Sequence, residues 1–329
     1  MSMKNALIKI VKYGVSISLL IFLYFKMEVN IPKIVDSIKH PSFLLISFGI
    51  VVFVIPSIVI NRWKYFLSLI GIKEKFFGLY KITHLSQFFG LLLPSSSGFI
   101  AIKIFMIEKK YPEYRGKAGS TVFIEKAFGI YTLVFLGLLG SYFIHDVPNL
   151  MGIRMVIVSI FILLLAIYFF LRSKLITKWC GKFGNYSKIK GVKKIFLYLE
   201  KFSLSILNFP IKKAFVTSVL IIIMFQISTI FNVYILFRVF DINIPFLYHL
   251  GFLPLIYIMA MVPLSISGLG IREGFFVYFY GLIGVDPAIA VTVSLVNYLI
   301  LSVTPALIGG FISLFSNTTL KSISLNSYA

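Results

Sequence analysis

The chain has 329 residues, of which 59% are apolar and only 13% charged, and its formal net charge is +21. Soluble domains carry about 25% charged residues, so a bilayer rather than water must cover this much apolar surface. Long unbroken apolar runs exclude a membrane barrel, whose strands alternate in polarity. A single cysteine, Cys180, excludes an internal disulfide and a zinc cluster. We therefore expect an all-α polytopic membrane protein.

Six apolar runs are about long enough to cross a membrane, which takes roughly 20 residues. They cover residues 8–25, 42–60, 119–141, 153–171, 214–238 and 287–313. The first run follows Lys4, Lys9 and Lys12 but has no small-residue cleavage site after it. We expect it to be an uncleaved first span.

Two further apolar stretches, 82–107 and 250–283, are interrupted by proline, serine and glycine. The breaks are Pro94-Ser95-Ser96-Ser97-Gly98 and Pro263-Leu264-Ser265-Ile266-Ser267-Gly268-Leu269-Gly270. Each half is too short to cross a hydrocarbon core roughly 30 Å thick. Since proline removes a helix donor and glycine permits a sharp bend, we predict two re-entrant helical hairpins.

The basic residues predict the orientation. If the N-terminus is cytoplasmic, only six basic residues fall on external segments: Lys26, Lys33, Lys39, Arg154, Arg238 and Arg272. Lys126 lies within a span, and all other lysines and arginines are then cytoplasmic. This bias predicts a multi-pass protein of the cell membrane with both termini in the cytoplasm. Because the basic residues flank apolar runs, we do not expect nucleic-acid binding.

The order of the elements repeats. Residues 8–141 and 153–313 each read span, span, hairpin, span, within one membrane domain that covers residues 1–329. The two hairpins enter from opposite sides, which is the outline of an inverted repeat, as found in transporters. The alternative is that the likeness of two short breaks arose by chance.

Segment 172–213 is the longest polar stretch, and its lysines are mixed with aromatic residues. Such a composition favours amphipathic helices that lie on the anionic inner leaflet. A surface that docks a partner protein is the alternative.

Charges inside a membrane are costly and are functional candidates by default. Glu125 and Lys126 lie in a predicted span, and Arg272 and Glu273 follow the second break. Adjacent helix positions point in different directions, so we expect Glu125 or Lys126 to pair with Arg272 or Glu273 across the repeat. Alternatively, Glu125 and Lys126 lie near the headgroups, where a lysine can snorkel.

The breaks also predict an anion site. Ser96 or Ser97, and Ser267, could cap the helices that follow, and helix N-termini attract anions. Lys103 and Arg272 would hold a phosphate, with Glu125 and Glu273 organising these cations. The other candidate binding residues are Lys126 and the break residues that allow close approach: Pro94, Gly98, Pro263, Ser265, Gly268 and Gly270. The alternative is that the serines only satisfy the backbone at a turn.

Other polar residues carry weaker signals. Asn61-Arg62-Trp63-Lys64 is typical of an anchor at the membrane interface. His84 and Gln87 either contact a substrate or pack against neighbouring helices. Asn297 suits a hydrogen bond between helices. The four histidines lack metal spacing, and no phosphate loop occurs. We expect neither a cofactor nor enzymatic activity, although a membrane-embedded transferase stays open.

Two stretches resemble the transmembrane region of lysylphosphatidylglycerol synthetases, also called the flippase-like domain. They are Leu91–Gly98 with Lys103 and Val122–Lys126, and Val262–Gly274, and the resemblance covers roughly residues 10–315. It implies two opposed hairpins that line a lipid cavity. Multidomain members move aminoacylated phosphatidylglycerol outward and carry an aminoacyltransferase domain, which we do not expect in this chain. Stand-alone members are associated with glycolipid and cell-surface polysaccharide pathways.

The first motif departs from the family pattern. Many members have an acidic residue near the position of Ile100 and an arginine at the position of Lys103, so this half-site lacks the acidic residue of the family pattern. From all these features we expect a lipid translocase that binds an anionic phospholipid or a lipid-linked phosphate. The alternative is a scaffold that recruits glycosyltransferases through segment 172–213.

Overall fold

The computed structural model describes residues 31–91, 98–144, 150–171, 174–186, 190–261, 265 and 268–315, and this part of the chain is helical and without strands. Its elements up to the middle of the chain are α2 (Ile31–Asp36), α3 (Ser42–Gly49), the π-helix η1 (Ile50–Val54), α4 (Ile55–Leu69), α5 (Phe76–Leu91), α6 (Gly98–Lys110), the short 3-10 helix η2 (Pro112–Tyr114) and α7 (Lys117–Phe143). They are followed by α8 (Leu150–Leu171), α9 (Lys174–Tyr186), α10 (Lys190–Leu207), α11 (Ile211–Arg238), α12 (Phe246–Ala260), α13 (Ile271–Gly281), α14 (Pro287–Tyr298), the π-helix η4 (Leu299–Val303) and α15 (Thr304–Phe315). The prediction of an all-α membrane fold is confirmed.

Among the described residues, four helices are long and apolar enough to cross a membrane: Ser42–Leu69, Lys117–Phe143, Phe215–Arg238 and Pro287–Phe315. A fifth candidate is α8 together with the start of α9, two helices that meet at a bend of 55°. Each of the five overlaps a predicted span. The predicted span 8–25 lies outside the described residues.

Large apolar side chains cover the outer faces of these helices. Leu45 and Phe53 on the first candidate span are 76% and 70% exposed, and Phe169 and Leu314 are 69% and 79% exposed. Contiguous apolar surface of this kind is rare on soluble monomers. Lipid chains are the natural neighbours of these faces.

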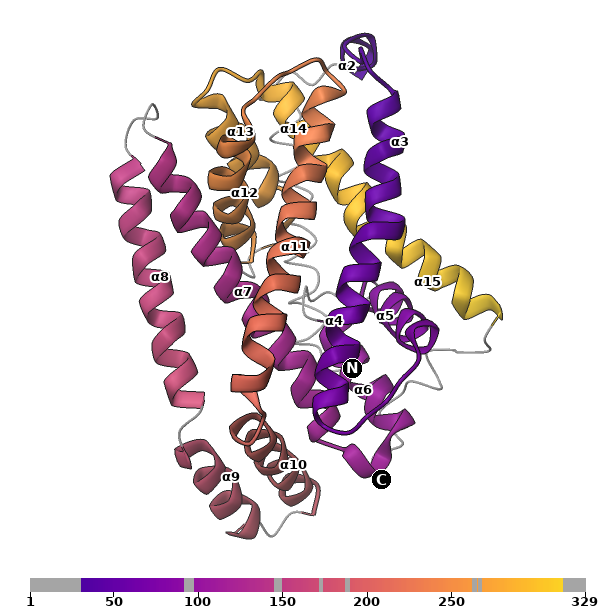
Figure 1. Ribbon diagram of the computed structural model, residues 1–329, viewed down its shortest axis with the longest axis vertical. Helices are drawn as coiled ribbons and strands as arrows, with labels where there is room; N and C mark the ends of the chain where they lie inside the picture. Colours follow the sequence, from indigo (N-terminus) through magenta and orange to yellow (C-terminus); the bar gives the residue numbers. More distant parts are fainter. Residues whose placement is uncertain are drawn as a thin grey trace, which may run out of the picture.

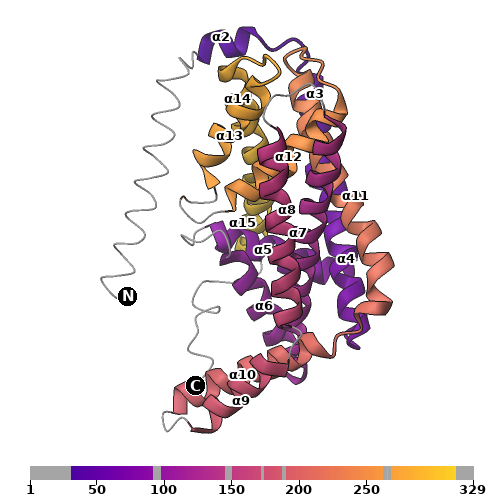
Figure 2. The ribbon, with the colours of Figure 1, turned by 90° about the vertical axis from the view of Figure 1, so that its left-hand side faces the viewer.

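The long helices run along the long axis of the molecule, and the two short helix pairs lie towards opposite ends of it. Figures 1 and 2 show α12 and α13 towards the end that carries α2, and α5 and α6 towards the end that carries α9 and α10. This arrangement is what two hairpins that enter from opposite sides would give. That they are re-entrant stays a prediction.

The two halves contact each other reciprocally. Helix α7, which follows the first pair, packs on α12, and α15, which follows the second pair, packs on α5. Both crossings depend on glycine. A Cβ on Gly140 would lie 2.5 Å from the backbone nitrogen of Gly251, and one on Gly309 would lie 2.0 Å from the carbonyl oxygen of His84. Reciprocal packing of this kind is the relationship that an inverted repeat would produce.

Segment 172–213 forms the antiparallel helices α9 and α10, which lie across one end of the bundle (Figures 1 and 2). Stacked rings of Phe183 and Phe196, with centroids 5.8 Å apart, join the two helices. Tyr198 of α10 donates a hydrogen bond of 3.0 Å to Glu108 of α6, which also accepts from the backbone of Gly116 and Gly119. Glu108 therefore fixes α10 to the start of α7.

A buried polar chain ties four helices together. Ser47 donates to Asn232 at 2.8 Å, Asn232 donates to Asn297 at 3.1 Å, and Asn297 donates to the hydroxyl of Tyr257 at 3.3 Å. The predicted hydrogen bond of Asn297 between helices is confirmed. Buried amides without partners are costly. This series of hydrogen bonds therefore fixes how α3, α11, α14 and α12 face one another.

Candidate functional site

A buried cluster of three charged side chains joins helices α4, α6 and α7. Arg62 donates from Nε and Nη2 to Oε1 of Glu125, at 3.1 and 2.6 Å, and Lys103 Nζ donates to Oε2 of the same carboxylate at 2.9 Å. The exposed fractions of Arg62, Lys103 and Glu125 are only 7%, 5% and 3%. We call these three residues the Arg62 cluster.

Aromatic rings form the walls of this cluster. The Nζ atom of Lys103 lies 4.0 Å from the centroid of the Trp63 ring, and the guanidinium carbon of Arg62 lies 5.4 Å from that of Phe225. The Trp63 indole donates to the hydroxyl of Thr121 at 3.2 Å, which fixes the ring. Cations on aromatic faces are stabilised where water is scarce, so these rings are favourable neighbours for Arg62 and Lys103.

The charges of the Arg62 cluster do not balance. Two cations share one carboxylate, and both oxygens of that carboxylate are already occupied. Nη1 of Arg62 is buried and has no hydrogen-bond partner in the described part of the chain. Burying an unbalanced charge and an unused charged donor is costly. The cluster is therefore suited to accept a further anionic group.

A second buried cluster lies at the start of α13. Nε of Arg272 donates to Oε1 of Glu273 and to the hydroxyl of Ser294, both at 3.0 Å, and Nη2 of Arg272 also donates to Glu273. Ser294 donates to Glu273 at 3.0 Å. The guanidinium carbon of Arg272 lies 4.7 Å from the centroid of the Tyr298 ring. One cation faces one carboxylate here, so this cluster is neutral.

The predicted ion pair across the repeat is wrong. Glu125 pairs with Arg62 and Lys103 within the first half, and Arg272 pairs with its neighbour Glu273. The neighbours can pair because both stand in the first turn of α13, where side chains lean towards the helix N-terminus. The long Arg272 side chain bridges the angle between two adjacent positions.

The carboxylate of Glu273 also occupies the N-terminus of α13, which we expected to attract an external anion. Its Oε2 atom accepts from the backbone nitrogen of Gly270 at 2.6 Å, which is half of a capping box. Gly268 and Gly270 adopt φ values of +73° and +84°, and a Cβ on Gly268 would lie 2.9 Å from the carbonyl oxygen of Ala260. These glycines shape the turn that brings the carboxylate of Glu273 onto the helix end.

The other predicted site residues are scattered. Lys126 is exposed on α7, outside both clusters, and Gly98 is buried at the first position of α6. Ser265 is 5% exposed, and its hydroxyl has no hydrogen-bond partner among the described residues. The remaining predicted positions lie outside the described residues: Pro94, Ser96, Ser97, Pro263 and Ser267.

Arg62 and Trp63 were predicted to be interface anchors, and the structure corrects this. Both side chains are buried, because the helix continues to Leu69 instead of ending near residue 60. The sequence did contain a sign that Arg62 is functional, because Arg62 directly follows an apolar run and a charged residue within a span is a functional candidate. Because the predicted span ended at residue 60, Arg62 was placed outside it.

The two clusters share one sequence spacing. Lys103 and Glu125 are 22 residues apart, and so are Arg272 and Ser294. Glu273, at the position after Arg272, supplies the carboxylate of the second cluster, and the residue after Lys103 is Ile104. The first cluster recruits its carboxylate from α7 and adds a second cation from α4, which leaves it positive.

These features define an integral membrane protein with two buried ion clusters, one neutral and one positive. In the described part of the chain, no group of three or more His, Cys, Asp and Glu side chains is placed to hold a metal ion.

The chain belongs to the family described as the lysylphosphatidylglycerol synthase TM region, which matches residues 9–309. It is 22% identical over 317 residues to the UPF0104 membrane protein MJ1595 of Methanocaldococcus jannaschii, covering 89% of this chain and 91% of that protein. No solved structure matches the chain. The expected family resemblance is thus confirmed.

Proposed function

We propose that this protein binds an anionic lipid headgroup at the Arg62 cluster and moves that lipid between the leaflets. The observation that carries the proposal is the unbalanced buried charge of Arg62, Lys103 and Glu125, together with the unused donor at Nη1 of Arg62. A phosphate or phosphodiester would supply the missing negative charge and accept from Nη1. Guanidinium groups suit such oxygens well.

The family supports a role with lipids, because its description names the membrane region of an enzyme that makes lysylphosphatidylglycerol. Ionisable groups inside a membrane also mark substrate pathways in transporters. The reciprocal packing of α7 on α12 and of α15 on α5 supports a mechanism in which the two halves move relative to each other. We place the protein in the cell membrane with both termini in the cytoplasm.

The test is lipid movement in proteoliposomes that contain the full chain. Dye-labelled phosphatidylglycerol, phosphatidylcholine and a polyprenyl phosphate would be compared, with a chemical quencher that reports the accessible leaflet. Arg62→Gln removes the cation that carries Nη1 and leaves Glu125 paired with Lys103. Lys64→Gln is the matched control, because it removes an exposed charge from the same helix.

We expect wild type and Lys64→Gln to move the anionic lipids faster than phosphatidylcholine. Arg62→Gln should lose this preference by roughly tenfold or more, since charged hydrogen bonds contribute about 1.5–3 kcal/mol. Equal movement of all lipids by wild type would refute the proposal. So would an unchanged preference in Arg62→Gln.

The second candidate function is a scaffold that recruits glycosyltransferases, for which the α9–α10 pair provides an observation. Trp179, Phe183 and Tyr186 on α9 are 64%, 52% and 77% exposed, beside the exposed Lys174 and Lys182. Helices of this kind also lie on anionic lipid. If the protein is a scaffold, replacing the α9 lysines with glutamine should abolish co-purification of a glycosyltransferase. If it is instead a lipid translocase, the same replacements should leave headgroup-selective lipid movement unchanged.

A further inference from the structure

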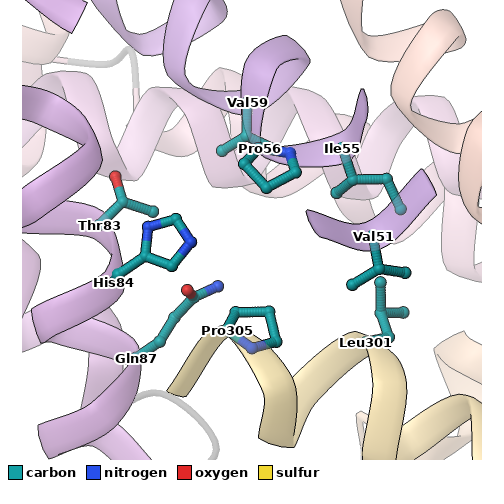
Figure 3. Close-up of a pocket in the computed structure, with 9 residues that line it drawn as sticks. All are labelled: Val51, Ile55, Pro56, Val59, Thr83, His84, Gln87, Leu301 and Pro305. Carbon is teal, nitrogen blue, oxygen red and sulfur yellow. The ribbon is translucent and has the colours of Figure 1, made fainter. Parts of the chain in front are cut away.

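A small cavity between α4, α5 and α15 suits water better than a substrate. Its volume is about 40 Å³, and a single water needs roughly 10–15 Å³. Figure 3 shows the ring of His84 and the amide of Gln87 pointing into it, whereas the hydroxyl of Thr83 points away. A larger binding surface is found on the α9–α10 pair.

The α9–α10 pair is tied to candidate membrane spans at both ends. Helix α8 ends at Leu171, and α9 begins at Lys174 after a bend of 55°. Helix α10 ends at Leu207, and α11 begins at Ile211. Figures 1 and 2 show the pair lying across one end of the bundle. Its connections to α8 and α11 therefore hold it close to one membrane surface.

One face of α9 carries an apolar stripe with lysines alongside it. Exposed apolar side chains recur at intervals of three or four residues and so share one helix face: Leu175, Trp179, Phe183 and Tyr186. Exposed lysines directly precede the first three of them: Lys174, Lys178 and Lys182. Aromatic residues and lysines arranged in this way are typical of helices that lie in the headgroup region of a membrane.

The two helices of the pair are joined along their length. The hydroxyls of Thr177 and Ser203 are hydrogen-bonded at 2.9 Å, in addition to the ring stacking between α9 and α10 described above. Glu200 is the only acidic residue of segment 172–213. A Cβ on Gly181 would lie 2.7 Å from its Oε1 atom, so the carboxylate of Glu200 lies against α9 between the helices. Positive charge therefore dominates the outer face of the pair, which complements an anionic surface.

Helix α10 contacts the junction between α6 and α7 through a buried carboxylate. The hydroxyl of Tyr198 donates to both oxygens of Glu108, at 3.0 and 3.2 Å, and Glu108 is only 4% exposed. The same carboxylate accepts from the backbone nitrogens of Gly116 and Gly119, at 3.0 and 3.1 Å. A Cβ on Gly119 would clash with Oε1 of Glu108, so this contact requires glycine.

The two helices that meet at Glu108 also carry two members of the Arg62 cluster. Glu108 follows Lys103 on α6, and Gly119 precedes Glu125 on α7. The ring of Phe202 on α10 packs edge-on against that of Phe123 on α7, with centroids 5.9 Å apart. A force on α10 therefore acts first on the start of α7.

We propose that the α9–α10 pair binds the anionic lipid surface of the adjacent leaflet, and that this binding stabilises the start of α7 through Tyr198 and Glu108. The lysines attract the charged headgroups, and the aromatic stripe enters the headgroup region. Each lysine near an anionic surface strengthens binding by roughly fivefold. A surface that binds α10 in this position also favours the contacts that α10 makes there. The inference is independent of the proposed function, because it does not use Arg62.

Trp179 reports directly on the first half of this inference. The chain has two tryptophans, and Trp63 is buried whereas Trp179 is exposed. The full chain would be placed in phosphatidylcholine vesicles whose acyl chains carry bromine near the headgroup, with or without phosphatidylserine. The fluorescence of Trp179 is the difference between wild type and Trp179→Phe.

Two triple variants test the role of the lysines. The first removes the basic stripe of α9: Lys174→Gln/Lys178→Gln/Lys182→Gln. The matched control removes three exposed lysines outside the pair: Lys64→Gln/Lys73→Gln/Lys75→Gln.

We expect phosphatidylserine to increase the quenching of Trp179 in wild type and in the matched control, and to have no effect in the first triple variant. Phosphatidylglycerol should act as phosphatidylserine does, because the surface recognises charge. Quenching that does not depend on anionic lipid would overturn the inference. An absence of quenching in all vesicles would also overturn it and would assign the surface to a protein partner.

Hydrogen exchange at Gly116 and Gly119 tests the second half. Phosphatidylserine should slow the exchange of these amides by roughly tenfold in wild type, as one hydrogen bond to a charged group would give. Tyr198→Phe should abolish this slowing and retain the quenching response of Trp179. Equal slowing in wild type and Tyr198→Phe would overturn the link to α7. Arg62→Gln should retain both responses, so failure of the proposed function and failure of this inference are distinguishable.

Discussion

Arg62 and Glu125 stand 63 residues apart in the chain and are joined by two hydrogen bonds to a single carboxylate oxygen. Lys103 occupies the other oxygen. The three helices α4, α6 and α7 thus meet at one buried carboxylate. The cluster keeps one positive charge in excess, and Nη1 of Arg62 has no hydrogen-bond partner among the described residues.

Replacing Glu125 with glutamine should destabilise the protein strongly. The change leaves two buried cations without their common partner, which costs roughly 3–5 kcal/mol. Thermal unfolding of the detergent-purified chain would measure the effect. Adding Lys103→Met to Glu125→Gln should restore much of the loss, since fewer unpaired cations remain. If the losses of unfolding free energy of the two single variants simply add in the double variant, Lys103 and Glu125 do not interact.

Replacing Glu273 with glutamine should act differently. Glu273 caps α13 through Gly270 and neutralises Arg272, so its loss should lower the unfolding temperature and leave Arg272 with an uncompensated charge. Ser294→Ala removes only one neutral partner and should cost about 1 kcal/mol. Because this cluster is neutral, neither change should reduce the preference for anionic lipids. A loss of that preference in Ser294→Ala would show that the second cluster also binds the headgroup.

Two glycines of α7 provide a matched pair for the helix crossing. A Cβ on Gly140 would press on the backbone of Gly251, whereas one on Gly129 meets nothing within 4 Å. Gly140→Ala should therefore separate α7 from α12 and destabilise the fold. Gly129→Ala should be neutral or slightly stabilising, by up to about 1 kcal/mol, because alanine favours helix. Unfolding temperatures that fall equally in both variants would contradict the close crossing.

Glu74 gives a prediction about pH. It accepts from Lys110 and Tyr111, each at 2.5 Å, between α4 and α5. Burial tends to raise the pKa of Glu74, but the hydrogen bonds from Lys110, Tyr111 and the backbone of Lys75 outweigh it and hold that pKa below its usual 4.5. Burial and the neighbouring carboxylate raise the pKa of Tyr111 to about 12.

A carboxyl group whose pKa is lowered by folding stabilises the fold above its unfolded pKa, and this contribution is lost as the pH falls through the folded value. Wild type should therefore exceed Glu74→Gln in unfolding temperature near neutral pH. The difference should shrink once the pH drops below 4.5, the usual pKa of Glu74. A difference that stays constant down to about pH 2 would show that the carboxylate charge is irrelevant there.

The sequence predicted the helical membrane class and the positions of five long apolar helices. Five apolar runs became long helices, since about 20 apolar residues in a bilayer satisfy their backbone only as helix. The breaks at 94–98 and 263–270 separate α5 from α6 and α12 from α13, as proline and glycine require. The resemblance to the family rested on the same breaks, and it is confirmed. These properties are local, so the order of residues along the chain is sufficient to determine them.

The pairing of charges depends on contacts between helices, which the order of residues does not reveal. Spacing marked Glu125, Lys103 and Arg272 as important, but it could not show that Arg62 reaches Glu125 or that Arg272 turns back to Glu273. Likewise, only the crossing of α4, α5 and α15 encloses Thr83, His84 and Gln87 in one cavity. Ion pairs and cavities form between helices that are distant in the chain, and glycine crossings and helix ends set those distances. Only the tertiary structure therefore decides which buried charge is balanced and which is not.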